Sequence, residues 1–375
     1  MNQIYVNWNV QGSKLIEYNV SYQPNLFDLE NESILPLSGG MKRSLVIIDS
    51  KVFELYGEKI VKYFESRGGN SKILKIDCDE TLKNLESTLA VIEEMEKFGL
   101  LRRSEPVIAI GGGSLLDIVG FACSIYRRGV PYIRIPTTLL SIVDVSVAVK
   151  TGINHFGRRN RLGTYFPPQA VYLDKSFIAS QSLRDISNGM GEIFKLAVIS
   201  DLELFEILES NAEMLLTEKF QFGAMPSRTI NRAISIMEKN LSSNLWEENL
   251  MRIVDFGHTF SPYIELAALP ELKHGEAVAL DCLFSSCISM LRGWITDIDL
   301  KRIFGVATKC GLPSAHALFH NKEILQNALD DTVKHRNGSQ NLPVPITIGG
   351  HTFVNDLDAN EIEEATILMC KFGSL

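Results

Sequence analysis

The sequence lacks the features that would place the protein in a membrane or outside the cell. No apolar run reaches the ~18 residues that a membrane-spanning helix requires. Residues 1–15 do not show a basic stretch followed by an apolar one, so they do not resemble a signal peptide. The 6 cysteines have no CxxC spacing, which is typical of reduced and mostly buried thiols. We therefore expect a cytoplasmic protein without a membrane partner.

Positive charge is also scarce. Lys and Arg number 37 against 45 Asp and Glu, which gives a net charge of -8. Proteins that bind nucleic acid usually present a basic surface, so we expect no nucleic-acid partner. A few local cations can still bind a small phosphate. With 45% hydrophobic and 22% charged residues over 375 positions, the chain is long enough for two globular domains.

The first half of the chain alternates between strand and helix patterns. Repeated strand–helix units of this kind predict a parallel sheet with right-handed crossovers. In residues 82–98, Leu85, Leu89, Ile92 and Met95 fall on one helical face. Helices are also predicted around residues 52–66 and from the glycines after residue 110 to about residue 127. Short apolar runs predict strands at residues 44–49, 72–76, 106–110 and 132–135.

After about residue 174 the pattern becomes mainly helical. We therefore predict an α/β nucleotide-binding domain at residues 1–177 and a mainly helical domain at residues 178–375. Helix-patterned segments occupy residues 189–208, 228–241, 274–291 and 321–333, and a strand pattern returns at residues 342–348.

A glycine-rich turn separates a predicted strand from a predicted helix. It consists of Gly111, Gly112, Gly113 and Ser114. Glycines let the backbone approach a pyrophosphate, and the following helix N-terminus offers free N–H groups and a positive dipole end. The pattern differs from the common GxGxxG fingerprint. The turn therefore indicates a dinucleotide site, with a plain tight turn as the alternative.

One carboxylate and two imidazoles are candidates for a metal site. Glu192 lies in a helical stretch, on the same face as Lys195. His258 follows a short apolar segment, and His274 opens another predicted helix. One Glu and two His are a common ligand set for a catalytic divalent metal. The spacing is too wide for a compact motif, so ordinary core or surface side chains are the alternative.

A polar run at residues 136–168 begins directly after a predicted strand. Ligands bind at the carboxyl edge of open α/β sheets, so we expect this run at that edge. Its cations suit a phosphate or a polyol. The alternative is a long solvated loop, which is uncommon at this length. The run contains Thr137, Thr138, Asp144, Lys150, Asn154, His155, Arg158, Arg159, Asn160 and Arg161.

Six segments together resemble the dehydroquinate-synthase superfamily of sugar phosphate cyclases. The resemblance implies a Rossmann-like parallel-sheet NAD-binding domain followed by a helical metal-binding domain. It also implies bound NAD and one divalent metal, zinc or cobalt, on Glu192, His258 and His274. In the order that the family shows, the segments are GGGSLLDIVGFACSIYRRG, IPTTLLSIVDVSVAVKTGINH, RRNRLGTYFPP, GEIFKLAVI, VDFGHTFSP and LKHGEAVALD.

Within this superfamily, INHFGRRNRLGTYFPP resembles the branch that makes 2-epi-5-epi-valiolone from sedoheptulose 7-phosphate. The implied reaction is a transient oxidation by NAD, phosphate elimination, re-reduction and an intramolecular aldol step. Leu241, Asp255 and His335 are similar to the substrate-selecting set of that branch. Arg252 lies near the place of an expected arginine, and Pro262 replaces a histidine of dehydroquinate synthases. An anionic Asp255 would repel the carboxylate of a dehydroquinate precursor but could accept hydrogen bonds from a neutral sugar end.

The resemblance also implies roles for individual residues. Asp144, Lys150, Asn160 and Lys195 are expected to contact the polyol, and Lys150, Asn160, Arg128 and His274 to lie near the phosphate. Arg128, with Arg127 as the alternative, is expected to reach in from a neighbouring subunit, which predicts a homodimer. The residues expected around NAD are Asp49, Glu80, Lys83, Gly111, Gly112, Gly113, Ser114, Asp117, Thr137, Thr138, Leu140, Asp144, Lys150 and Arg159.

Three other functions stay open on the sequence. A metal-dependent polyol dehydrogenase would share the two-domain plan but release NADH in bulk. A sibling cyclase, such as a 2-epi-valiolone synthase or a 3-dehydroquinate synthase, would share the metal site. A cyclase fold kept as an NAD-binding or assembly protein would be supported by a lost metal ligand, and none of the three is lost.

Overall fold

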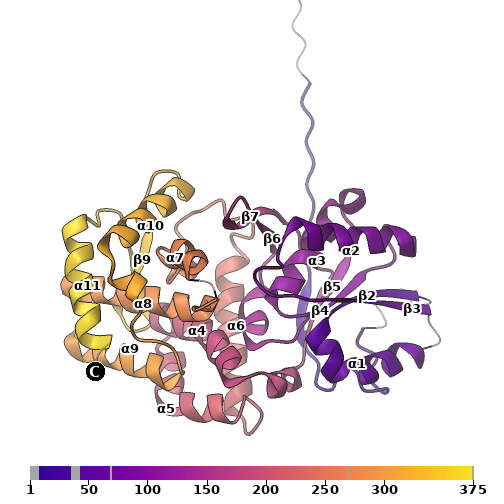
Figure 1. Ribbon diagram of the computed structural model, residues 1–375, viewed down its shortest axis with the longest axis horizontal. Coiled ribbons are helices and arrows are strands. Elements are labelled where there is room, and N and C mark those ends of the chain that lie inside the picture. Colours follow the sequence, from indigo (N-terminus) through magenta and orange to yellow (C-terminus); the bar gives the residue numbers. More distant parts are fainter. Residues whose placement is uncertain (1–7, 35–42, 68–69, 269, 374–375) are drawn as a thin grey trace, which may run out of the picture.

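The computed structural model describes residues 8–34, 43–67, 70–268 and 270–373. A sheet-containing half and a helical half lie side by side along the longest axis (Figure 1). Residues 1–7, part of the segment compared above with a signal peptide, lie outside the described residues. Within the described part of the chain, no helix is long and apolar enough to cross a membrane.

Six parallel strands form the sheet, which confirms the predicted fold class. Alternate residues of one strand face opposite sides. Leu45 and Ile47 pack toward helices α2 (Leu85–Phe98) and α3 (Gly113–Ile125), whereas Val46 and Ile48 pack toward α1 (Ser50–Glu65). Both faces are covered, which explains why the strands are continuous apolar runs. In spatial order the strands are β1 (Asn19–Tyr22), β8 (Ala170–Leu173), β5 (Tyr132–Pro136), β4 (Val107–Gly111), β2 (Arg43–Asp49) and β3 (Asn70–Ile76).

The helices of this half correct one detail of the prediction. Helix α2 (Leu85–Phe98) begins after its cap Asn84 and buries Val91 and Met95. Leu85 and Leu89, on the predicted face, are 36% and 53% exposed. The predicted face is therefore only half correct: Met95 is buried and Ile92 packs against the core, but near its start the helix turns Thr88 and Val91 toward the sheet in place of Leu85 and Leu89. The other helices are α1 (Ser50–Glu65) and α3 (Gly113–Ile125), which ends slightly before the predicted residue 127.

The polar run at residues 136–168 is a folded unit rather than a loop. A π-helical turn, η3 (Ser141–Val145), precedes an antiparallel hairpin of β6 (Lys150–His155) and β7 (Arg158–Tyr165). Phe156 and Gly157 form its two-residue turn, and both have positive φ values of 53 and 64. That combination suits the twist of a tight hairpin. The hairpin carries the polar side chains of this run across to the helical half.

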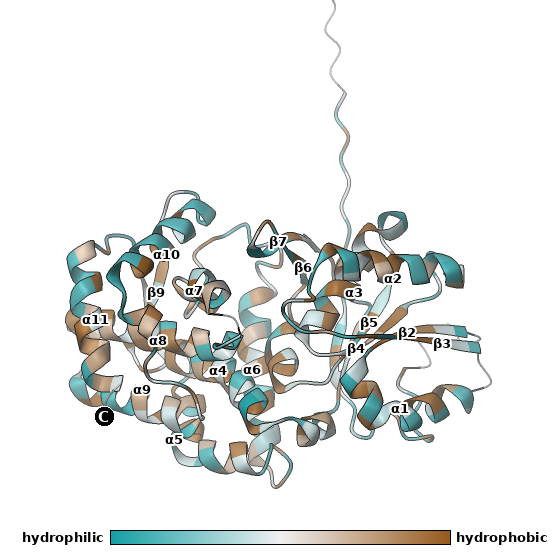
Figure 2. Cartoon of the chain, in the orientation of Figure 1, coloured by the Kyte–Doolittle hydropathy of each residue, from teal (hydrophilic) through white to brown (hydrophobic). Residues whose placement is uncertain are grey.

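The helical half is built around α8 (His274–Leu291), which is buried along most of its length and mainly hydrophobic (Figure 2). The segment predicted as one helix at residues 189–208 is two helices, because Asp201 adopts an extended conformation and caps the second. The other elements are α4 (Leu183–Ser200), α5 (Leu202–Thr217), α6 (Met225–Leu241), α7 (Ser261–Ala267), α9 (Asp297–Lys309), α10 (Lys322–His335), β9 (Leu342–Thr347), β10 (Gly350–Val354) and α11 (Ala359–Gly373).

Candidate active site

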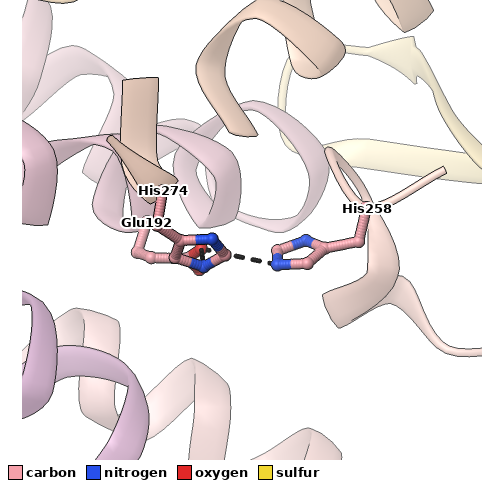
Figure 3. Close-up of side chains that lie close together, drawn as sticks. All are labelled: Glu192, His258 and His274. Carbon is pink, nitrogen blue, oxygen red and sulfur yellow. Dashed lines mark ion pairs between the residues drawn. The ribbon is translucent and has the colours of Figure 1, made fainter. Parts of the chain in front are cut away.

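Three side chains from separate segments converge in the helical half. Glu192 comes from α4, His258 from the loop before α7, and His274 from the first position of α8 (Figure 3). Their candidate ligand atoms all lie within 4.8 Å of one another. From Glu192 Oε1, the Nε2 atom of His274 is 3.4 Å away and that of His258 is 3.7 Å away. The structure therefore brings the predicted metal trio together.

Close backbone packing at three glycines makes this convergence possible. Helices α4 and α8 meet at Gly191 and Gly275, where a Cβ on Gly191 would lie 2.3 Å from the Gly275 carbonyl oxygen. Gly257 has a φ of +75, and a Cβ there would lie 2.6 Å from Cys282 Sγ. Each member of the trio directly adjoins one of these glycines. Larger side chains would force the three candidate ligands apart.

The outer nitrogen of each imidazole has its own acceptor. His274 Nδ1 lies 3.0 Å from Glu265 Oε2, and His258 Nδ1 lies 3.2 Å from the Phe256 carbonyl oxygen. With both Nδ1–H groups donated in this way, both Nε2 atoms face Glu192. Burial would lower the pKa of His274, but Glu265 and Glu192 outweigh burial and raise the pKa to about 9, so a metal would replace the Nε2 proton of that imidazole. Burial, aided by the Lys195 charge, holds the pKa of His258 well below its usual value. That imidazole is therefore neutral and can act as a ligand.

Glu192 fits the role of an anionic ligand. It is 1% exposed, its Oε2 pairs with Lys195, and its Oε1 faces the two imidazoles. Burial alone would raise the pKa of Glu192, but its ion pair with Lys195 and the nearby imidazoles outweigh burial and hold the pKa well below its usual value. A buried, ionised carboxylate beside two imidazoles is the donor set of a divalent transition metal.

The glycine-rich turn lines a cavity of about 560 Å³, here called the glycine-turn cavity. Helix α3 begins at Gly113, and its cap residue Gly112 provides no side-chain hydrogen bond. The first N–H groups of α3 are therefore free for an anion such as a pyrophosphate. Gly111 ends β4 beneath the turn. Members of the predicted NAD set that line the cavity are Asp49, Glu80, Gly112, Gly113, Ser114, Thr137, Thr138 and Leu140.

The other six members of the predicted NAD set do not line this cavity: Lys83, Gly111, Asp117, Asp144, Lys150 and Arg159. Lys83 Nζ lies 2.6 Å from both Asp117 Oδ2 and Asn160 Oδ1. Arg159 Nε lies 2.9 Å from Glu80 Oε1. Burial would raise the pKa of Glu80, but Arg159 and Lys83 outweigh it and lower the pKa to about 2. Through these contacts, Lys83 and Glu80, in the loop after β3, bind Asn160 and Arg159 of the β6–β7 hairpin.

Two further cavities adjoin the metal trio. The inner cavity, about 470 Å³, is lined by Asp144, Lys150, Asn160, Lys195, Leu241, Asp255, His258 and His274, among others. The outer cavity, about 750 Å³, is lined by Lys150, Arg158, Arg159, Asn160, Arg161, Arg252, Asp255, His335 and Arg336, among others. Lys150 and Asp255 belong to both. His274 lines the inner cavity and the glycine-turn cavity, so it marks the place where these two meet.

A chain of alternating charges forms one wall of these cavities. Lys150 Nζ lies 2.8 Å from Glu247 Oε1, and Glu247 also pairs with Arg252. Arg252 Nη2 lies 2.8 Å from Asp255 Oδ2, and Arg336 Nη2 lies 3.6 Å from the same oxygen. Asp255 is therefore not the isolated anion that the sequence suggested. Two guanidinium groups neutralise it, so charge repulsion alone is a weak reason for it to reject a carboxylate.

Sequence reasoning missed three charged residues of this site. Glu247 lies in the loop after α6, and no pattern in the sequence distinguishes it. Arg336 follows His335 at the end of α10 and is 6% exposed. Glu265 is 2% exposed on α7. A glutamate within the apolar α7 segment, seven positions after a candidate ligand, was the available signal for the last of these.

The two candidate intersubunit arginines differ in their partners. Arg127 Nη1 lies 3.3 Å from the Leu100 carbonyl oxygen, and its Nη2 lies 3.7 Å from Glu96. Arg128 is exposed, has a φ of 62, and lines none of the three cavities. No described residue of its own chain forms an ion pair with it. Arg128 is thus the more available of the two.

Comparison with known families agrees with this architecture. A model described as 3-dehydroquinate synthase N-terminal matches residues 73–188, and one described as 3-dehydroquinate synthase C-terminal matches residues 189–334. Together they span most of the chain. The protein therefore belongs to the 3-dehydroquinate synthase family of sugar phosphate cyclases.

Within that family, the chain is similar to proteins named 2-epi-5-epi-valiolone synthase. It is 45% identical to the one from Streptomyces albus, over 98% of this chain and 91% of the relative. It is 42% identical to the one from an Actinoplanes species, over 96% of this chain and 93% of that relative. A solved structure of ValA, the 2-epi-5-epi-valiolone synthase of Streptomyces hygroscopicus subsp. jinggangensis, has NAD+ and Zn2+ bound. It matches with a TM-score of 0.93 and 41% identity, over 97% of this chain and 99% of that one.

Proposed function

We propose that the protein converts sedoheptulose 7-phosphate to 2-epi-5-epi-valiolone with release of phosphate, and so acts as a lyase that uses NAD and one divalent metal, zinc or cobalt. The observation that carries this proposal is the position of His274, which lines both the glycine-turn cavity and the inner cavity. A metal ligand thus lies where a dinucleotide and a sugar would meet. The similarity to valiolone synthases, one of them with NAD+ and Zn2+, supports it.

The two cofactors would divide the chemistry between them. NAD would supply a reversible hydride acceptor, and the metal would lower the pKa of the sugar hydroxyl that it holds. Glu192, His258 and His274 would hold the metal. The free N–H groups at the start of α3 would bind the pyrophosphate. Asp49 would accept a hydrogen bond from the adenosine ribose, as an acidic residue at a strand end does in related folds.

The inner cavity would hold the polyol. Lys195 is 2% exposed; burial lowers its pKa, but Glu192 and Asp144 outweigh burial and raise it. Lys195 would therefore stay an ammonium and donate hydrogen bonds to sugar hydroxyls. Lys150 and Asn160, which border both cavities, would hold the phosphate. As the C7–O bond breaks, the phosphate itself would take the proton from C6, so these residues would position the sugar.

Substrate selection would depend on the wall between the two cavities. Leu241 contributes an apolar contact to the inner cavity, and His335 lines the outer one. Asp255, held by Arg252, would accept hydrogen bonds from hydroxyls at the sugar end. Because guanidinium groups hold the Asp255 carboxylate in place, its acceptor lone pairs point in a defined direction. We propose that this direction, more than net charge, favours a neutral sugar end.

The experiment that tests this function uses two substrates in parallel. The purified protein receives catalytic NAD, Co²⁺ or Zn²⁺, and either sedoheptulose 7-phosphate or 3-deoxy-arabino-heptulosonate 7-phosphate. Phosphate release from the first substrate alone, without net NADH, and NMR couplings of 2-epi-5-epi-valiolone are expected. Turnover of the second alone would mean a dehydroquinate synthase. Bulk NADH formation would mean a polyol dehydrogenase, and other couplings from the first substrate would mean a sibling cyclase.

We also propose a homodimer in which Arg128 reaches the phosphate of the neighbouring subunit. Its exposure and lack of ion-pair partners within its own chain support this. Mixing Arg128→Ala with His274→Ala protein tests it, because a mixed dimer would contain one site with both residues intact. If half of the dimers are mixed, about a quarter of wild-type activity is expected from two nearly inactive parents. Mixtures no more active than the parents, despite subunit exchange, would exclude an intersubunit Arg128.

A further inference from the structure

Glu265 on α7 belongs to neither the metal trio nor the predicted ligand sets, yet it touches one of the trio. Its Oε2 lies 3.0 Å from His274 Nδ1. The opposite ring nitrogen of His274, Nε2, lies 3.4 Å from Glu192 Oε1. The imidazole is therefore held on the side that faces away from the proposed metal position. With 2% exposure, Glu265 has little access to water as a substitute partner.

A buried carboxylate needs a compensating charge, and Arg159 supplies it. Arg159 reaches across from β7, forms an ion pair with Glu265, and also binds Glu80. Arg159 Nη1 lies 3.2 Å from His274 Nδ1 as well. Arginine cannot accept a hydrogen bond, so a protonated Nδ1 has Glu265 as its acceptor while Arg159 bonds the same carboxylate. The arrangement favours one tautomer of His274, with the proton on Nδ1 and the lone pair on Nε2.

We propose that Glu265, neutralised by Arg159, is a positioning residue that fixes the ring orientation and the tautomer of His274 for metal binding. This inference rests on the metal site of the proposed function. An imidazole that donates its second N–H to a carboxylate is a more basic and better oriented ligand. Loss of such an outer partner typically weakens metal affinity by roughly 10–100-fold.

The test measures Co²⁺ binding to the full-length protein after removal of bound metal. The Kd and the visible spectrum of bound Co²⁺ are compared for wild type, Glu265→Gln and Glu209→Gln. The last is a matched control, because Glu209 pairs with Arg302 between α5 and α9 of the same half. We expect Glu265→Gln to weaken Co²⁺ binding roughly 10–100-fold with an altered spectrum, and the control to bind like wild type. At saturating Co²⁺, most of the kcat of Glu265→Gln should return.

The outcomes separate this inference from the function beneath it. If wild type binds no Co²⁺, the metal site and this inference are both overturned. If wild type and Glu265→Gln bind Co²⁺ with the same Kd and spectrum, this inference alone is overturned. Should the glutamine variant fail to fold, Glu265→Asp keeps the charge that pairs with Arg159 but shortens the reach to His274. Weaker Co²⁺ binding by that variant supports the positioning role, and unchanged binding overturns it.

Discussion

The proposed metal site and the wall of the outer cavity are both rich in charge, but they differ in sign and in burial. Around the metal trio, carboxylates of Glu192 and Glu265 are about 2% exposed and surround two imidazoles. Along the outer cavity, cations outnumber carboxylates, and the Lys150 side chain is 54% exposed. The first region suits a cation in a dry setting. The second suits a phosphorylated polyol that arrives from water.

This difference sets how strongly a change in each region should act. Inside the metal site, charges interact at short range with little screening, so each partner is essential. On the wall, water and salt weaken every ion pair that is partly exposed. We therefore expect the largest losses from the metal trio, intermediate losses from Asp255 on the wall, and small effects where solvent reaches the cations.

The most severe change should be His258→Ala. It removes one proposed metal ligand and leaves the buried Glu192 without one of the two imidazoles it faces. Because the metal would supply several kcal/mol of charge stabilisation, we expect turnover to fall roughly 10³-fold or more. Metal content measured on the purified protein should fall in parallel. His351→Ala, an exposed histidine on β10, is the matched control and should keep both. Full activity of His258→Ala would remove it from the ligand set.

The next largest effect should come from Asp255→Asn, which makes the wall more positive. The substitution leaves Arg252 and Arg336 without their shared carboxylate. Losing a charged hydrogen-bond acceptor costs about 1.5–3 kcal/mol, so kcat/KM for sedoheptulose 7-phosphate should fall roughly 10–100-fold. Inhibition by 3-deoxy-arabino-heptulosonate 7-phosphate should become tighter, since its carboxylate would meet two guanidinium groups that Asp255 no longer neutralises.

A control separates the wall from general charge loss. Asp356→Asn removes a carboxylate that pairs with Arg292 at the surface, with 79% side-chain exposure. It should leave kcat/KM and inhibition unchanged. If Asp255→Asn likewise changes neither kcat/KM for sedoheptulose 7-phosphate nor inhibition by 3-deoxy-arabino-heptulosonate 7-phosphate, Asp255 plays no part in substrate selection. The similarity to the substrate-selecting set of the valiolone branch would then be misleading.

The two halves of the molecule also differ in how far the sequence could predict them. The buried parallel strands β2, β4 and β5 are short apolar runs, so the pattern predicted each of them nearly to its ends. The edge strand β3 is only partly buried, and the prediction began two residues late there. The edge strand β1, exposed at both ends, gave no such signal, because an edge strand has no continuous apolar requirement. Strand β8 is an interior, buried strand, but it has only 4 residues and was also missed. The β6–β7 hairpin was missed because its turn, Phe156–Gly157, lacks the usual Asn-Gly or Asp-Gly signal.

Site residues divide in the same way. Each member of the metal trio follows or precedes a glycine that close packing requires. The sequence motif and the observed geometry therefore point to the same three residues: Glu192, His258 and His274. Glu247 shows the opposite case. Its role depends on a loop that brings it to Lys150, almost 100 positions earlier in the chain, and no local pattern records that contact. Charged residues that act through long-range ion pairs could therefore not be predicted from the sequence.

A smaller effect is expected from Gly112→Ala in the glycine-turn cavity. The added Cβ would lie 3.3 Å from Thr138 Cγ2, where the neighbour must yield slightly. It would also narrow the place proposed for the pyrophosphate. A strain of about 1–2 kcal/mol predicts an NAD Kd roughly tenfold weaker by calorimetry, with Co²⁺ affinity unchanged. Unchanged NAD affinity would place the pyrophosphate elsewhere.

The mildest perturbation, added salt, compares the two regions within one protein. Between 50 and 500 mM potassium chloride the Debye length shrinks severalfold, so attraction between a phosphate and the exposed wall weakens. We expect KM for sedoheptulose 7-phosphate to rise about two- to fivefold, measured by phosphate release. The Kd for Co²⁺ should change less, because Glu192 and Glu265 are about 2% exposed and the two imidazoles are less exposed than Lys150. Equal salt dependence of KM and of the Kd for Co²⁺ would show that solvent ions reach the metal site as easily as the wall. The difference in burial between the two regions would then not govern binding.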